Sequence, residues 1–114
     1  MKIAFTASDA PVAQTARAVL ATRYGAVDEG AADVIVALGG DGFMLHTLHR
    51  TQSLDVPVYG MNRGTVGFLM NAYSESDLVA RLKDLRQRLG LLHADRYKQA
   101  RHTAGDVAAG MAHP

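Results

Sequence analysis

The sequence predicts an α/β domain with an open, mainly parallel sheet covered by helices, and three observations support this fold class. Short apolar runs alternate with segments of helical spacing as far as Gly90, which is the order expected for a parallel sheet with covering helices. The run Val34–Leu38 is apolar at every position, as in a strand buried on both faces of such a sheet. It leads directly into a glycine-rich turn, Gly39–Gly42 with the sequence GGDG, and then into a helical segment.

The first strand is predicted at Ile3–Ala7, a short run of apolar and β-forming residues. Ser8 and Asp9 then predict a helix cap, with Pro11 in the first helical turn. Gly25 is a suitable end for this helix. Between these limits the apolar residues recur at helical spacing, namely Val12, Ala16, Val19, Leu20 and Tyr24.

A second helix is predicted over residues 43–52, directly after the glycine turn. The third strand is predicted at Val56–Gly60, with Pro57 near its start, where a missing hydrogen-bond donor is tolerated. Ser74 and Asp77 resemble a capping box that opens a third helix. The apolar face of that helix is predicted to carry Leu78, Leu82, Leu85 and Leu89 before Gly90 ends it.

The length and the end of the chain bear on its domain organisation. A chain of 114 residues suits one domain. We expect residues 1–90 to form a nucleotide-binding α/β domain that contains the GGDG turn. Residues 91–114 end in small residues with no clear period, so we expect an irregular tail. A truncated chain ends in this way more readily than a natural domain does.

The composition excludes several classes of protein. Hydrophobic residues make up 48% of the chain and charged residues 20%, as in ordinary folded proteins. A formal net charge of +1 gives no support for binding nucleic acid or a membrane surface through bulk charge. The absence of cysteine excludes disulfides, thiolate metal sites and a cysteine nucleophile. With no signal-peptide pattern and no apolar run near the roughly 20 residues of a membrane span, we expect a cytoplasmic protein.

The GGDG turn is the main candidate site. Glycine permits a backbone with positive φ and lets a ligand approach the main chain closely. The turn follows a strand of an open α/β sheet, at the edge where such sheets bind ligands, and the next helix offers unpaired N–H groups to an anion. We therefore expect Gly39, Gly40 and Gly42 to bind phosphate. Two common phosphate motifs are excluded, because Leu45 stands where a GxGxxG motif needs glycine and the chain has no Gly-Lys pair.

Asp41 is the unusual member of this turn. A carboxylate beside polyphosphate is electrostatically unfavourable unless a metal ion or a proton transfer compensates. Asp41 is therefore a candidate to accept the proton of an attacking hydroxyl, or to hold a cation that bridges phosphates. The alternative is that Asp41 only stabilises a tight turn, as aspartate often does. The flanking glycines and the buried strand favour the chemical role.

A second glycine-rich loop, Gly60–Phe68, follows the third strand and is expected at the same edge of the sheet. Arg63, with Gly64 beside it, is a candidate to bind phosphate. Phe68 offers a flat apolar face to a purine. The alternatives are a solvated Arg63 and a Phe68 that packs in the core.

The two loops together resemble a known family. The GGDG turn followed by Met44-Leu45, then Asn62-Arg63-Gly64 and Gly67-Phe68-Leu69, is similar to the amino-terminal domain of bacterial NAD kinases over roughly residues 1–90. The GGDG turn alone is shared with phosphofructokinases and lipid kinases, so the pair of motifs at this separation carries the resemblance. The family transfers a phosphoryl group from ATP, or in some members inorganic polyphosphate, to the 2′-hydroxyl of the adenosine ribose of NAD, giving NADP.

The resemblance also implies roles for particular residues. Asp41 would accept the proton of the ribose hydroxyl, Asp41 and Gly42 would contact the dinucleotide, and Phe68 would lie near its adenine. His46 matches a position that is often polar and ligand-facing in the family, although a histidine on an amphipathic helix is more often a partly exposed bystander. We expect Mg²⁺ or another divalent cation to accompany ATP, held mainly by phosphate oxygens, and we assign it no protein ligand.

The chain also departs from the family. The family continues into a β-rich second domain that carries an Asn-Glu pair, and no such pair occurs in this sequence. Its active site lies between the two domains and is commonly completed by a neighbouring subunit of a homo-oligomer. We therefore interpret the sequence as a fragment or truncated form, with residues 91–114 as the remnant of the connection to the missing domain.

Half of such a cleft cannot position two nucleotides, so we expect weak or absent activity from this chain alone. Two other interpretations stay open. One is a sugar or lipid kinase of the same GGDG superfamily, and the other is a non-catalytic nucleotide-binding or interaction module.

Overall fold

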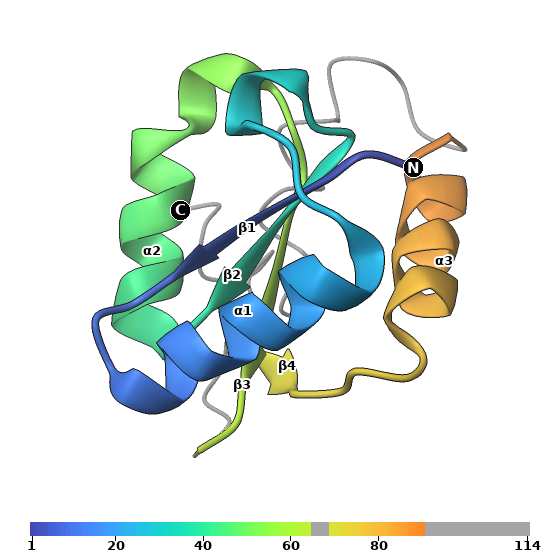
Figure 1. Ribbon diagram of the computed structural model, residues 1–114. Coiled ribbons are helices and arrows are strands. Elements are labelled where there is room, and N and C mark those ends of the chain that lie inside the picture. Colours follow the sequence, from blue (N-terminus) through green and yellow to red (C-terminus); the bar gives the residue numbers. More distant parts are fainter. Residues whose placement is uncertain (65–68, 91–114) are drawn as a thin grey trace.

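Figure 1 shows a computed structural model of the chain, which describes residues 1–64 and 69–90. The elements in chain order are β1 (Ile3–Ala7), α1 (Pro11–Tyr24), the 3₁₀ turn η1 (Glu29–Ala31), β2 (Val34–Leu38), α2 (Asp41–Arg50), the 3₁₀ turn η2 (Gln52–Leu54), β3 (Val58–Asn62), β4 (Asn71–Ala72) and α3 (Leu78–Gly90). Within the described ranges the strands form a four-stranded sheet in the order β1-β2-β3-β4, and each neighbouring pair is parallel. The predicted open parallel sheet with covering helices is confirmed.

The strand that carries the glycine turn is the most buried one. All residues of β2 are buried, because β1 and β3 flank it and helices cover the sheet. The strands predicted at Ile3–Ala7 and Val34–Leu38 have these same bounds in the structure. The third strand, predicted at Val56–Gly60, is instead Val58–Asn62. Pairing with β2 begins only after Pro57, which lacks the N–H that a strand residue donates.

Strand β4 was not predicted from the sequence. It has only two residues, too few for a periodic pattern to indicate a strand. It pairs with the end of β3, with Met61 opposite Asn71 and Asn62 opposite Ala72. The chain therefore returns to the carboxyl end of β3 after the second loop, and it does so without an intervening helix among the described residues.

The ends of helix α1 agree only partly with the prediction. Pro11 is its first residue, and Gly25 follows its last with a φ of 75°, a conformation that favours glycine. The predicted cap by Ser8 and Asp9 is wrong, because the N-cap is Ala10 and no side chain caps the helix. The fixed φ of proline already suits the first helical position.

The face that α1 buries also differs from the expected one. Its buried residues are Ala13, Ala16 and Leu20. Val12 and Val19, predicted to be part of the apolar face, are 50% and 38% exposed. Alanines at a contact allow a helix to approach its neighbour closely, and helical spacing alone cannot distinguish which of two adjacent apolar rows makes that contact.

The molecule has three layers. Helix α2 covers one face of the sheet, and α1 and α3 lie on the other (Figure 1). On the α2 side, a Cβ atom added at Gly60 would lie 3.0 Å from Sδ of Met44 and 2.7 Å from Sδ of Met70, so glycine lets these methionines pack on β3. On the other side, Arg81 of α3 donates a hydrogen bond to the hydroxyl of Tyr59 at 3.2 Å.

Helix α3 begins later than the sequence indicates. The capping box predicted a start near Ser74, whereas the helix begins at Leu78. The Ser74 hydroxyl donates to the carboxylate of Asp77, so its hydrogen bond goes to a side chain and not to the helix backbone. The carbonyl of Asp77 accepts the N–H of Arg81 at 3.0 Å. The predicted apolar face is confirmed as buried for Leu78, Leu82 and Leu85.

One further expectation can be checked in the described residues, and two others lie outside them. No helix in residues 1–64 and 69–90 is long and apolar enough to cross a membrane. The predicted irregular tail, residues 91–114, and the candidate residue Phe68 lie outside the described residues.

Candidate functional site

The carboxyl ends of the strands meet at one edge of the sheet, as predicted, and the two glycine-rich loops start there. The N–H of Gly39 donates to the carbonyl of Met61 at 3.1 Å, which joins the end of β2 to that of β3. The N–H of Ser8 donates to the carbonyl of Leu38 at 2.9 Å, which joins the end of β1 to that of β2. This edge is where open α/β sheets bind their ligands.

The glycines of the GGDG turn are present for different reasons. None of the three has a positive φ, so the conformational freedom expected from the sequence is not what this turn uses. Gly39 is buried, and an added Cβ would lie 3.0 Å from Cβ of Phe43. At Gly40 and Gly42 an added Cβ would meet no atom within 4 Å. Open space beside these two glycines leaves the backbone accessible to a ligand.

Helix α2 starts at the turn itself. The sequence predicts its start near Phe43, but Asp41 is the first helical residue and Gly40 is the N-cap. No side chain caps this end of the helix. The N–H groups of a first helical turn and the positive end of the helix dipole favour anions, including the Asp41 carboxylate itself. The end of α2 therefore combines an acid with the donor groups of a phosphate site.

The carboxylate of Asp41 joins the two loops. Its Oδ1 accepts the N–H of Leu69 at 2.9 Å, between residues 28 apart in the sequence. Asp41 is half-buried, so neighbouring residues do not cover it fully. The hydrogen bond restricts the orientation of the carboxylate at the open edge of the sheet.

The base of the second loop is held by backbone and amide groups. The N–H of Tyr73 donates to the carbonyl of Asn62 at 3.2 Å. The side chain of Asn71 donates to the carbonyl of Gly60 at 3.0 Å. Oδ1 of Asn62 accepts the N–H of Gly64 at 3.3 Å, a local turn typical of asparagine. Gly64 itself is exposed beside this turn.

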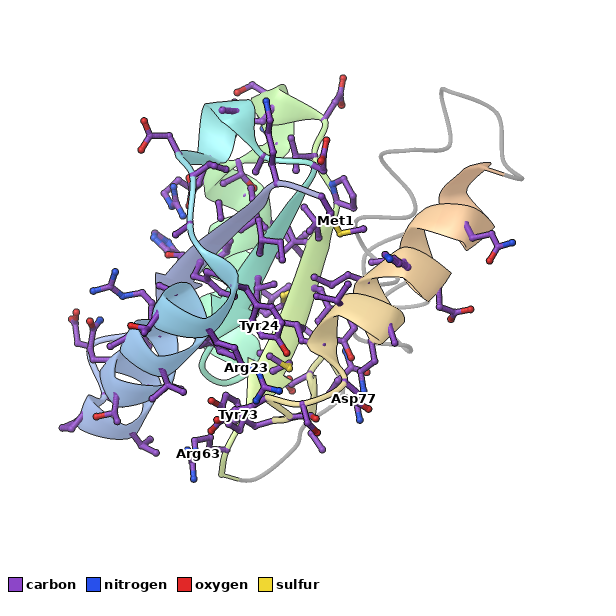
Figure 2. All side chains as sticks on the ribbon, turned by 45° about the vertical axis from the view of Figure 1, so that its right-hand side comes forward. Met1, Arg23, Tyr24, Arg63, Tyr73 and Asp77 are labelled. Atoms are coloured by element: carbon purple, nitrogen blue, oxygen red, sulfur yellow. The ribbon has the colours of Figure 1, made fainter. Side chains whose placement is uncertain are left out.

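Arg63 contacts two side chains at the base of this loop (Figure 2). Its guanidinium carbon lies 4.7 Å from the centroid of the Tyr73 ring, a cation–π distance. Its Nη1 lies 4.0 Å from Oε2 of Glu75. Burial raises the pKa of the Tyr73 hydroxyl to about 12, and the nearby Glu75 carboxylate adds to the rise. The Tyr73 hydroxyl therefore stays protonated near neutral pH.

The described site residues predicted from the sequence lie in two places, at α2 with the turn before it and, for Arg63 and Gly64, directly after β3. Asp41, Gly40 and Gly42 lie at the open start of α2, whereas Gly39 is buried beneath them. His46 is exposed on α2, one turn further along the helix. In the described part of the chain, no group of three or more His, Cys, Asp or Glu side chains is arranged to hold a metal ion.

Sequence reasoning missed three contributors to this edge. The amide of Leu69 gives no signal in the sequence, because a backbone donor is the same in every residue except proline. Tyr73 and Glu75 precede α3 in a segment without periodicity. Tyr73 and Glu75 follow Arg63 closely in the sequence, and this proximity was the signal available for their contact with it. The contact itself depends on the pairing of β4 with β3, which was not predicted.

Comparison with known sequences identifies the family. The sequence model of the ATP-NAD kinase N-terminal domain matches residues 2–89. The chain belongs to this family. The NAD kinases of Cereibacter sphaeroides, Caulobacter vibrioides and Xanthomonas campestris are 64%, 59% and 57% identical to it over 88, 81 and 84 residues. These matches cover 77%, 71% and 72% of this chain but 35%, 31% and 33% of the relatives. The chain thus spans about a third of the length of these curated relatives.

Proposed function

We propose that this chain supplies the nucleotide-binding α/β domain of an NAD kinase. The complete reaction would transfer a phosphoryl group from ATP, or from inorganic polyphosphate, to the 2′-hydroxyl of the adenosine ribose of NAD, giving NADP. Membership of the NAD kinase family supports the proposal. The observation that carries it is the half-buried Asp41 between two glycines whose backbone is open to a ligand.

In the proposed reaction, Asp41 accepts the proton of the ribose 2′-hydroxyl as that oxygen forms a bond to the γ-phosphorus. The bond from this phosphorus to the bridging oxygen of ADP breaks, and ADP leaves with the electron pair. The N–H groups at the start of α2 would stabilise negative charge on the phosphoryl oxygens. The Leu69 N–H, 2.9 Å from Oδ1 of Asp41, would keep the carboxylate directed at the open edge.

The remaining substrate contacts are proposals that follow from the sequence. Gly39, Gly40 and Gly42 would form the phosphate-binding turn, with Gly39 acting through its packing. Phe68 would lie near the adenine of NAD, and His46 would face the dinucleotide. Mg²⁺ or another divalent cation would enter with ATP, bound by phosphate oxygens. A homo-oligomer and a cytoplasmic location also stay predictions.

A chimera would test the proposed activity in a complete enzyme. Residues 2–89 of this chain would replace the matching segment of the Cereibacter sphaeroides relative, which is 64% identical over 88 residues. ATP-dependent formation of NADP is expected from the chimera. Asp41→Asn should lower kcat by about 10²- to 10⁴-fold, the usual contribution of a general base. Asp84→Asn, an exposed position on α3, is the matched control and should leave kcat unchanged.

The outcomes separate the competing functions. Equal turnover in the chimera and its Asp41→Asn variant would remove Asp41 from the mechanism. For the 114-residue chain itself, a thermal-shift comparison of NAD, fructose 6-phosphate and diacylglycerol distinguishes the substrates of the GGDG superfamily. Stabilisation by NAD without NADP formation in the chimera would favour a nucleotide-binding module.

A further inference from the structure

The contact between Arg63 and Tyr73 closes the base of the second loop. Arg63 directly follows β3, and Tyr73 directly follows β4, so the contact joins the two positions where the chain leaves and rejoins the sheet. The guanidinium carbon of Arg63 is 4.7 Å from the centroid of the Tyr73 ring. Nη1 of Arg63 also lies 4.0 Å from Oε2 of Glu75. Figure 2 shows the two labelled side chains close together at this end of the molecule.

The same residues also reach the first glycine turn. A small cavity of about 10 Å³ is lined by Gly39 of the first turn, by Asn62 and Arg63 of the second loop, and by Tyr73. The cavity has room for about one water molecule, and α1 also lines it. Tyr73 therefore borders a space that residues of both loops share.

The contact with Arg63 is made by the ring of Tyr73. The hydroxyl oxygen is buried and lies near the Glu75 carboxylate, which helps to raise its pKa. The aromatic face is occupied by Arg63. A phenylalanine at this position would keep the contact.

We propose that Tyr73 is a positioning residue for the proposed phosphoryl transfer to NAD. Its ring packs on Arg63 and so holds the point where the chain leaves β4. Residues 69–73 connect this point to the Leu69 N–H, which donates to Asp41. The inference rests on the proposed function, because its consequence is the orientation of the proposed base. It assigns to Arg63 a structural contact in place of a direct contact with phosphate.

Hydrogen exchange of the full 114-residue chain tests the inference without any turnover. In Tyr73→Leu, the Leu69 amide should exchange about fivefold faster relative to Val36 of the central strand, the change expected when one cation–π contact is lost. Tyr73→Phe keeps the ring, so Leu69 should exchange as in the wild type. NAD titrated into the same samples should bind about fivefold more weakly to Tyr73→Leu and unchanged to Tyr73→Phe.

A second substitution covers the case in which Tyr73→Leu does not fold. Arg63→Gln alters an exposed residue and removes the cation from the ring, so it should accelerate the Leu69 amide to the same extent. If Arg63 instead binds phosphate directly, Arg63→Gln would weaken ATP binding and leave the Leu69 amide unchanged. That result would overturn the inference.

The remaining outcomes are also decisive. Equal Leu69 exchange in the wild type and Tyr73→Leu would overturn the role of Tyr73, as would an equal acceleration in Tyr73→Phe. If the wild-type chain alone does not bind NAD, the same titration is made with the chimera and its Tyr73→Leu variant, and the Leu69 exchange rates still decide the role of Tyr73. Failure of the chimera to bind NAD would count against the proposed function.

Discussion

The two loops at the edge of the sheet are built in different ways. The first turn, Gly39–Gly42, takes its geometry from its immediate neighbours, because Gly39 packs under Phe43 and α2 starts at Asp41. The base of the second loop is held by contacts between separate segments, among them the Tyr73 N–H on the Asn62 carbonyl and Arg63 on the Tyr73 ring. The first region is therefore built from adjacent residues, and the base of the second joins residues that lie further apart in the sequence.

This difference bears on how each region can fail. A change in the first turn alters either packing or ligand access, and which of the two depends on the glycine concerned. A change at the base of the second loop is expected to alter the orientation of the Leu69 N–H and the Asp41 carboxylate, and it leaves the space beside the glycines open. The hydrogen bond from the Leu69 N–H to Asp41 at 2.9 Å joins the first turn to the residue that follows the second loop, so this bond reports on both regions.

The largest effect on stability is expected at the buried glycine of the first turn. In Gly39→Ala the new Cβ would lie 3.0 Å from Cβ of Phe43, an atom close to the helix backbone that cannot move easily. Overpacking of this kind should lower the free energy of unfolding by about 1–3 kcal/mol. Urea denaturation followed by circular dichroism would measure it, and an unchanged midpoint would contradict the packing role assigned to Gly39.

The exposed glycine of the same turn should behave in the opposite way. Gly42 lies in the first turn of α2, and an added Cβ meets no atom within 4 Å. Because alanine loses less backbone entropy in a helix, Gly42→Ala should raise the free energy of unfolding by up to about 1 kcal/mol. The same methyl group would occupy space proposed for NAD, so calorimetric titration should detect weaker NAD binding by this more stable variant. Undiminished binding would exclude a close approach of NAD to Gly42.

The comparison also explains how much could be predicted from the sequence. The apolar run Val34–Leu38 and the glycines after it indicated both the central strand and the first turn, because this region is determined by adjacent residues. Positive φ, one of the two reasons given for the glycines, was wrong, since close packing at Gly39 cannot be distinguished from positive φ in a sequence. Whether each glycine serves packing or ligand access needs the positions of its neighbours in space.

The second region could be predicted only in outline. The motif around Asn62 and Arg63 indicated a functional loop, but Arg63 was interpreted as a phosphate ligand or a solvated side chain. Its contact with Tyr73 follows from β4, a strand of two residues that leaves no periodic signal. Non-local contacts of this kind depend on the register of the sheet, which hydrophobic spacing alone does not define at so short a strand.

The smallest expected effect lies far from both loops and serves as their control. Arg50, the last residue of α2, donates to both carboxylate oxygens of Glu29 at 2.6 and 2.8 Å. Glu29 lies in η1, before β2, and Arg50 lies before β3. This ion pair is therefore at the amino ends of the strands, opposite the edge that carries Asp41. Its removal should change stability and leave the proposed site unaffected.

The sign of its pH dependence follows from the pKa of Glu29. The hydrogen bonds from Arg50 lower this pKa below its ordinary value of 4.5, so the pair stabilises the fold above pH 4.5 and loses this effect as the pH falls through the lowered pKa. Because both side chains are partly exposed, Glu29→Gln should cost less than about 1 kcal/mol at pH 7. Urea denaturation at pH 7 and below pH 4 should show the difference from wild type shrinking in acid, with Leu69 amide exchange at neutral pH unchanged. Altered Leu69 exchange in this variant would mean that the edge near Asp41 responds to any loss of stability. The distinction between a local turn and a loop base joined from separate segments would then have no measurable consequence.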